Sequence, residues 1–184
     1  MTSQADSELP AYATAPRPKR VKRIRLALLV SSFAACLGVT LMGYIFKGLF
    51  TLAFGILGLG GFAVGERGFL GGVEMALQLA SLNFFLFFIT VPAAALALGL
   101  SIGRFPHRGI TALKPYLRWG AVWGAILVGG TTFAFGWFGG AAAAFGALLS
   151  GGLIGVLAGA FCGFLLHLIV APGRQLTDVD VLVF

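Results

Sequence analysis

The stretch FGALLSGGLIGVLAGAFCGFLLHLIV, residues 145–170, decides the class of this fold. It contains no Asp, Glu, Lys or Arg, and it exceeds the roughly 20 apolar residues that a helix needs to cross a membrane. Small residues occur at every fourth position, at Ala143, Ala147, Gly151, Gly155, Gly159 and Gly163, and His167 follows at the same spacing. Such spacing lets another helix approach closely. We therefore predict a transmembrane helix with a packing face at Gly151, Gly155, Gly159 and Gly163, used inside the bundle or, alternatively, by a second subunit.

The composition of the whole chain agrees with a membrane protein. Apolar residues make up 59% of its 184 residues and charged residues only 10%, whereas a soluble domain has about a quarter of its residues charged. The net charge of +7 comes mostly from two basic clusters beside apolar runs. This placement is typical of membrane-flanking segments and argues against nucleic-acid binding. Cys36 and Cys162 both lie in apolar runs, so no disulfide framework is indicated.

Three further apolar runs predict spans at residues 26–46, 76–102 and 119–138. Trp119 and Trp137, 18 residues apart, would lie about 27 Å from each other on one face of the third span, as anchors at two membrane interfaces do. Pro92 interrupts the second span, and a kink is expected there because proline removes a helical hydrogen bond. The predicted fold is an all-α integral membrane protein, a bundle of four transmembrane helices over residues 26–171.

The glycine-rich segment 48–65 decides between four spans and five. With four spans, eleven basic residues lie on the side of the N-terminus and only Lys47 and Arg67 on the other. With five, the count is seven against six, so the positive-inside bias favours four. Segment 48–65 is then predicted to be re-entrant or interfacial. Both termini would be cytoplasmic, in a membrane that is most simply a prokaryotic inner membrane, with a disordered basic tail at 1–25 and a short tail at 172–184.

Polar side chains at the start of the second span are the best candidates for a functional site. Glu74, Gln78 and Ser81 share one helical face, which should meet protein or water and not lipid. Arg67 is a possible ion-pair partner for Glu74. Asn83 and Thr90 are expected on the opposite face of this helix, so they do not extend the stripe inward. The stripe is read either as a solvated helix start or as the mouth of a solute path.

His167 is the remaining polar candidate within a span. Haem ligation and proton transfer are the functional alternatives, and packing near the membrane surface is the plainer one. The basic tail is expected to contact anionic lipid headgroups through Arg17, Lys19, Arg20, Lys22, Arg23 and Arg25.

No motif for catalysis, for a cofactor or for a metal is recognisable, so none of these sites is assigned. The leading hypothesis is a small accessory protein that packs through its small-residue helix faces into a larger membrane complex or a homo-oligomer. The alternative is a small permease or channel with a polar mouth near Glu74. A membrane enzyme ranks third, because no nucleophile or acid–base pair is evident.

Overall fold

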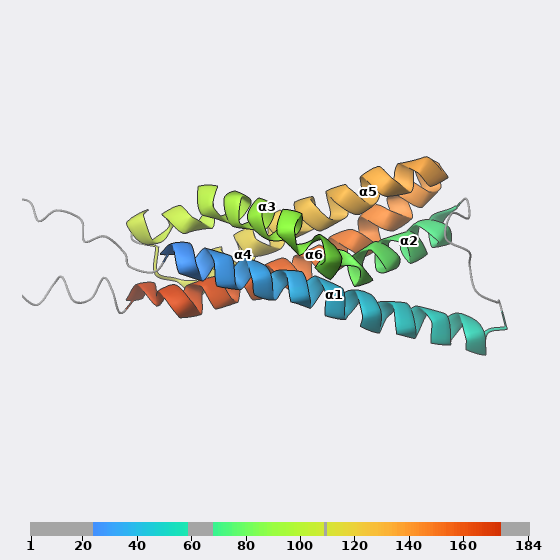
Figure 1. Ribbon diagram of the computed structural model, residues 1–184, viewed down its shortest axis with the longest axis horizontal. Helices are drawn as coiled ribbons and strands as arrows, with labels where there is room; N and C mark the ends of the chain where they lie inside the picture. Colours follow the sequence, from blue (N-terminus) through green and yellow to red (C-terminus); the bar gives the residue numbers. More distant parts are fainter. Residues whose placement is uncertain (1–23, 59–67, 109, 174–184) are drawn as a thin grey trace, which may run out of the picture.

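The computed structural model describes residues 24–58, 68–108 and 110–173, and all regular structure within them is helical. The helices run along one long axis, and the start of α1 lies at the same end as the end of α6 (Figure 1). We call this the terminal end of the bundle. Residues 1–23 and 174–184, which hold most of both predicted tails, lie outside the described residues.

The first helix is longer than the sequence predicts. α1 spans Ile24–Ile56, 33 residues, and therefore passes through Lys47 and into the segment expected to be re-entrant. Residues 48–56 continue α1 as regular helix, and Gly58 follows with a left-handed φ of 66°. Residues 59–65 of the segment lie outside the described residues.

The second span is broken. α2 covers Phe69–Ser81, a 3-10 turn covers Asn83–Leu86, and α3 covers Phe87–Leu100. Pro92, where a kink is expected, lies inside α3, and the helix changes its geometry about two turns earlier, at the 3-10 turn. α2 packs on α1 and α6, whereas α3 packs on α1 and α4.

The third span is nearly continuous over Leu113–Gly139. It consists of α4 (Leu113–Gly124), a π-helical turn (Ala125–Gly129), α5 (Gly130–Gly136) and a final 3-10 turn. Gly140, with a φ of 97°, makes the tight connection to α6, a conformation that L side chains rarely adopt.

The last helix, α6, covers Ala141–Val170 and contacts α1, α2, α4 and α5. Within the described residues, four helical segments are long and apolar enough to cross a membrane: Ile24–Ile56, Asn83–Leu100, Leu113–Gly139 and Ala141–Val170. The protein is therefore a helical bundle with the dimensions and the apolar surface of a membrane-embedded chain.

Glycines bring the backbones of α4 and α6 into contact. A Cβ added to Gly159 would overlap the carbonyl oxygen of Gly120, and one added to Gly155 would overlap that of Gly124. Gly163 meets the carbonyl of Tyr116 in the same way. We call this contact the glycine seam. Nothing larger than glycine fits at these positions unless the two helices separate.

Small residues also join α2 to its neighbours. A Cβ on Gly72 would overlap the carbonyl oxygen of Ala143 on α6, and one on Gly43 of α1 would overlap the backbone of Ser81. Larger side chains fill the spaces between these contacts. Ile154 of α6 packs with Leu77 of α2 in a buried cluster that also includes Val39, Ala80 and Ala158.

Candidate functional site: a polar interface between the first and second spans

The predicted polar stripe of α2 is covered by α1. The ammonium of Lys47 donates a hydrogen bond to the side-chain oxygen of Gln78. Ser81 is buried, and its hydroxyl donates to the backbone carbonyl of Gln78 at 2.7 Å. Gly43, one turn before Lys47, lets α1 come close to the backbone at Ser81. The ammonium of Lys47 on α1 therefore points at α2, where the amide oxygen of Gln78 accepts its hydrogen bond.

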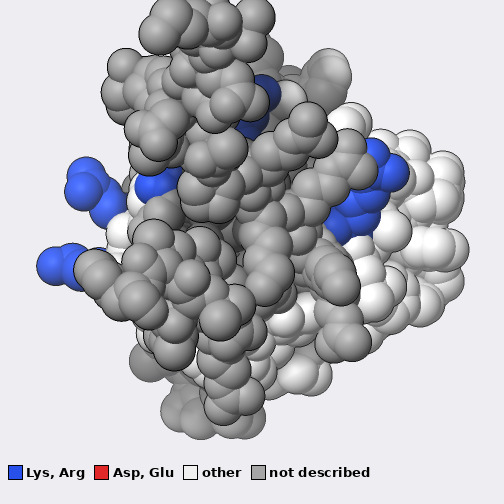
Figure 2. All heavy atoms as spheres, turned by 90° about the vertical axis from the view of Figure 1, so that its left-hand side faces the viewer, with Lys and Arg blue, Asp and Glu red and all other residues white. Residues whose placement is uncertain are grey.

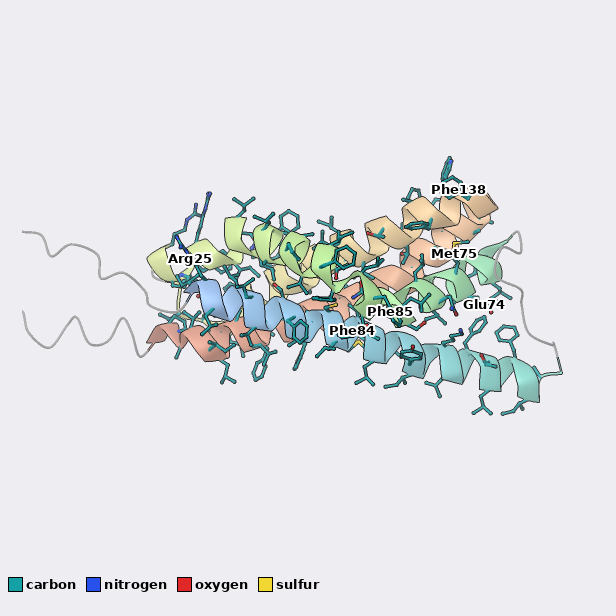
Figure 3. All side chains as sticks on the ribbon, viewed as in Figure 1. Arg25, Glu74, Met75, Phe84, Phe85 and Phe138 are labelled. Carbon is teal, nitrogen blue, oxygen red and sulfur yellow. The ribbon has the colours of Figure 1, made fainter. Side chains whose placement is uncertain are left out.

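Glu74 lies one helical turn before Gln78 on α2 and is half-buried. In Figure 3 its side chain extends from α2 on the side of the bundle where α1 lies. Glu74 and Lys47 are the only charged residues of the described chain away from the terminal end. The structure therefore places one acid and one base at the same pair of helices, remote from all other described charges. Arg67, the predicted partner of Glu74, lies outside the described residues.

The break in the second span extends the polar contacts toward the middle of α1. The amide of Asn83 donates to the backbone carbonyl of Cys36 at 3.3 Å and lies 3.2 Å from its sulfur. The sulfur is also 3.5 Å from the hydroxyl of Thr90. The prediction that Asn83 and Thr90 face away from the stripe is wrong, because the 3-10 turn changes the direction of the side chains between α2 and α3. Both residues face α1, as Gln78 does.

Along α1, the polar residues recur with helical spacing on the face toward the second span. Thr40 donates to the carbonyl of Cys36 at 3.1 Å, and Ser32 precedes Cys36 by one turn. Ser32 is buried, and its hydroxyl finds no hydrogen-bond partner among the described residues. The polar interface, as we call it, comprises Ser32, Cys36, Thr40 and Lys47 of α1 with Glu74, Gln78, Ser81, Asn83 and Thr90 of the second span.

The polar interface brings together several kinds of hydrogen-bonding group. It offers an ammonium, a carboxyl group, two amides, hydroxyls and a thiol. Among the described residues no three His, Cys, Asp or Glu side chains come together as a metal site would require. The arrangement can exchange hydrogen bonds with water, an ion or a small polar solute.

His167 lies apart from the polar interface, at the terminal end. Its Nε2 is 2.9 Å from the carbonyl oxygen of Thr111, and its ring meets that of Tyr116 edge-on, with centroids 5.1 Å apart. The hydroxyl of Tyr116 donates to the carbonyl of Ile110 at 3.1 Å. His167 therefore ties the segment before α4 to the end of α6.

The other predicted residues divide between the bundle interior and the terminal end. Gly151, Gly155, Gly159 and Gly163 all face the third span within the chain, and Gly151 meets the side chain of Thr132. Arg25 is exposed at the start of α1. The remaining headgroup candidates, Arg17, Lys19, Arg20, Lys22 and Arg23, lie outside the described residues.

Sequence reasoning missed Lys47, Cys36, Asn83 and Thr90 as parts of one site. From the sequence, Lys47 lies just beyond the predicted first span, and Cys36 lies within an apolar run. The fourfold spacing of Ser32, Cys36 and Thr40 was the available signal, since it marks a polar face on an otherwise apolar helix. Comparison of the chain with known protein families, characterised proteins and solved structures returns no match.

Proposed function

We propose that the protein is a small permease or channel in which the polar interface is the route of a small polar or charged solute. The observation that carries the proposal is the hydrogen bond from Lys47 on α1, a helix apolar enough to cross a membrane, to Gln78 on α2. Lys47 lies nine residues before the end of α1, about 14 Å along the helix. Ionisable groups within a long apolar helix are costly and commonly mark solute or ion paths.

The broken second span supports the same function. Transporters often place their binding sites where a transmembrane helix is interrupted, because the freed backbone and nearby polar side chains can contact the solute. Here the interruption at Asn83–Leu86 carries the contacts of Asn83 to Cys36, about three turns along α1 from Lys47. The polar contacts therefore extend from the region near Glu74 to the middle of the bundle.

The distribution of charge supports an orientation with the terminal end in the cytoplasm of a prokaryotic cell. Of the six described basic residues, only Lys47 lies away from the terminal end. Because positively charged loops remain on the cytoplasmic side, the mouth near Glu74 would open to the outside of the inner membrane.

The two native cysteines provide a test of the route. Both are buried, but Cys36 belongs to the polar interface, whereas Cys162 lies in the apolar cluster of α6 with Leu98, Tyr116 and Leu166. Thiosulfonate reagents attack the ionised thiol, which requires water at the sulfur. In proteoliposomes, a small cationic thiosulfonate should label Cys36 at least about tenfold faster than Cys162, as measured by mass spectrometry of peptides. The variants C36S and C162S each leave one cysteine, so the label measured in each variant belongs to the cysteine that remains.

Equal and slow labelling of both cysteines would overturn the proposal, provided that both react fully after denaturation in dodecyl sulfate. Protection of Cys36 by a solute, with Cys162 unchanged, would extend the proposal by identifying what the route accepts. The variant K47M removes the cation of the polar interface and should change the rate of Cys36 labelling. The matched control K114M removes a cation at the terminal end and should leave that rate unchanged.

The second candidate is the accessory protein that packs into a larger membrane complex or homo-oligomer. The glycine seam does not favour it, because α4 of the same chain already occupies that face. The exposed second span does favour it: only 6% of Asn83–Leu100 is buried, and Phe85, Phe88 and Ile89 are each more than half exposed. Purification in mild detergent would distinguish the two, since a stoichiometric partner that is lost in F85A/F88A supports the accessory function and a monomer excludes it.

A further inference from the structure

Exposed basic side chains gather at the terminal end of the bundle. They are Arg25 at the start of α1, Arg104 and Arg108 in the segment after α3, and Lys114 and Arg118 on α4. No described acidic residue lies at this end, because Glu74, the only acid among the described residues, is on α2. Figure 2 shows Lys and Arg side chains at opposite sides of the end face, and none of the coloured side chains on it is acidic. We call this set the basic collar.

The segment that carries Arg104 and Arg108 is anchored to the bundle. Ile102 and Phe105 on either side of Arg104 are buried, and the ring of Phe105 meets Tyr116 edge-on at 5.3 Å. The contact of His167 with Thr111 holds the far end of the same segment. The two arginines are therefore presented from a fixed backbone, which lowers the entropy lost when they bind a ligand.

The depth of the basic collar is indicated by its aromatic neighbour. Trp119 follows Arg118 on α4, and both are exposed, with Trp119 exposed by 45%. Tryptophan prefers the level of the lipid headgroups. Lys114 lies one turn before Arg118, so α4 presents two cations and an indole ring where the apolar surface of the bundle ends.

We propose that the basic collar binds the phosphate headgroups of anionic phospholipids in the facing leaflet. Charge complementarity and the position at the edge of the apolar surface support lipid as the occupant. The spread of the cations to opposite sides of the end fits several lipids around the bundle, whereas a nucleic acid would need one continuous basic patch or stripe. This inference does not depend on the proposed transport function.

The test measures lipid preference in the full chain. The purified protein is exposed to mixed micelles of phosphatidylglycerol and phosphatidylcholine, and the bound lipids are counted by native mass spectrometry. In the variant R104Q/R108Q/K114Q/R118Q, the preference for phosphatidylglycerol over phosphatidylcholine should fall at least about threefold. The matched control R104K/R108K/R118K keeps every charge and should keep the preference. Circular dichroism and size exclusion identify a variant that has failed to fold, and single substitutions then replace the set.

An unchanged preference in the glutamine variant, or in each single variant, would overturn the proposal. Inorganic phosphate at the same phosphate concentration should not displace the lipid, since it lacks the acyl chains that place a headgroup at the membrane edge. If it does displace the lipid, the collar is a site for free phosphate and the lipid assignment fails. Tighter binding to a short RNA than to phosphatidylglycerol would overturn it as well.

Discussion

The glycine seam and the broken second span show two ways in which helices associate in this bundle. At the seam, α4 and α6 touch through backbone atoms at Gly120, Gly124, Gly155 and Gly159. In an 18-residue apolar window of α6, 44% of the residues are buried, compared with 6% for Asn83–Leu100. Asn83–Leu100 meets α1 partly through polar side chains, those of Asn83 and Thr90 at Cys36. Close packing holds the centre of the bundle, and hydrogen bonds add to the packing of a helix that has little buried surface of its own.

Gly159→Ala should break the seam and give the largest effect. Its Cβ would overlap the backbone of Gly120, which no change of rotamer can relieve, so the helices must separate. We expect a loss of about 3 kcal/mol in the free energy of unfolding, measured in mixed micelles with dodecyl sulfate. Gly130→Ala is the matched control, because a Cβ there meets no atom within 4 Å. Equal stability of the two variants would show that the seam is not tightly packed.

Asn83→Ala should weaken the second span to a smaller extent. It removes the donor that reaches Cys36 across the helix pair, and such hydrogen bonds contribute about 0.6 to 1.7 kcal/mol in membranes. Because the break is then less well held, thiosulfonate labelling of Cys36 should rise while that of Cys162 stays constant. Ser150→Ala is the control, since its hydroxyl bonds only within α6. Unchanged labelling would mean that packing, and not Asn83, holds the break.

Thr132→Val should give the smallest effect. It tests a polar contact on the α6 side of the bundle, where the glycine seam lies. The hydroxyl of Thr132 donates to the carbonyl of Ala147 at 2.8 Å, so a polar contact exists beside the glycines as well. We expect a loss of about 0.6 kcal/mol, the average for such bonds. Thr131→Val should cost less, because Thr131 is exposed and bonds only to its own helix at Leu127. A loss as large as that of Gly159→Ala would contradict the division into a packed seam and a polar interface.

The number of apolar helices could be predicted from the sequence because it depends on local composition. The bounds and interruptions could not, because they depend on distant contacts. Lys47 appeared to end the first span, yet it continues the helix with Gln78, 31 residues away, as its partner. Pro92 was the local signal for a break, but the helix changes at Asn83, whose side chain is held by Cys36 at a separation of 47 residues.

Of the polar interface, only the residues on α2 could be predicted from the sequence. Glu74, Gln78 and Ser81 are close in sequence and share a face, so helical spacing brings them together without any knowledge of the bundle. Their partners on α1 required the pairing of the two helices, which neither charge nor hydropathy encodes. The same holds for the glycines of α6: their spacing predicts a close neighbour, but not that the neighbour is α4.

The central place of α6 has a consequence for biosynthesis. α6 follows α1, α2, α4 and α5 in the chain, and it contacts all four. A ribosome that adds about ten residues per second completes α6 roughly ten seconds after α1 has emerged. During that interval the earlier helices are in the membrane without their shared partner, and the glycines of α4 face whatever surrounds them. During this interval, membrane quality-control proteases would encounter an incomplete bundle. A substitution in α6 should therefore lower the cellular amount of the protein by a larger factor than its effect on the stability of the folded protein would predict.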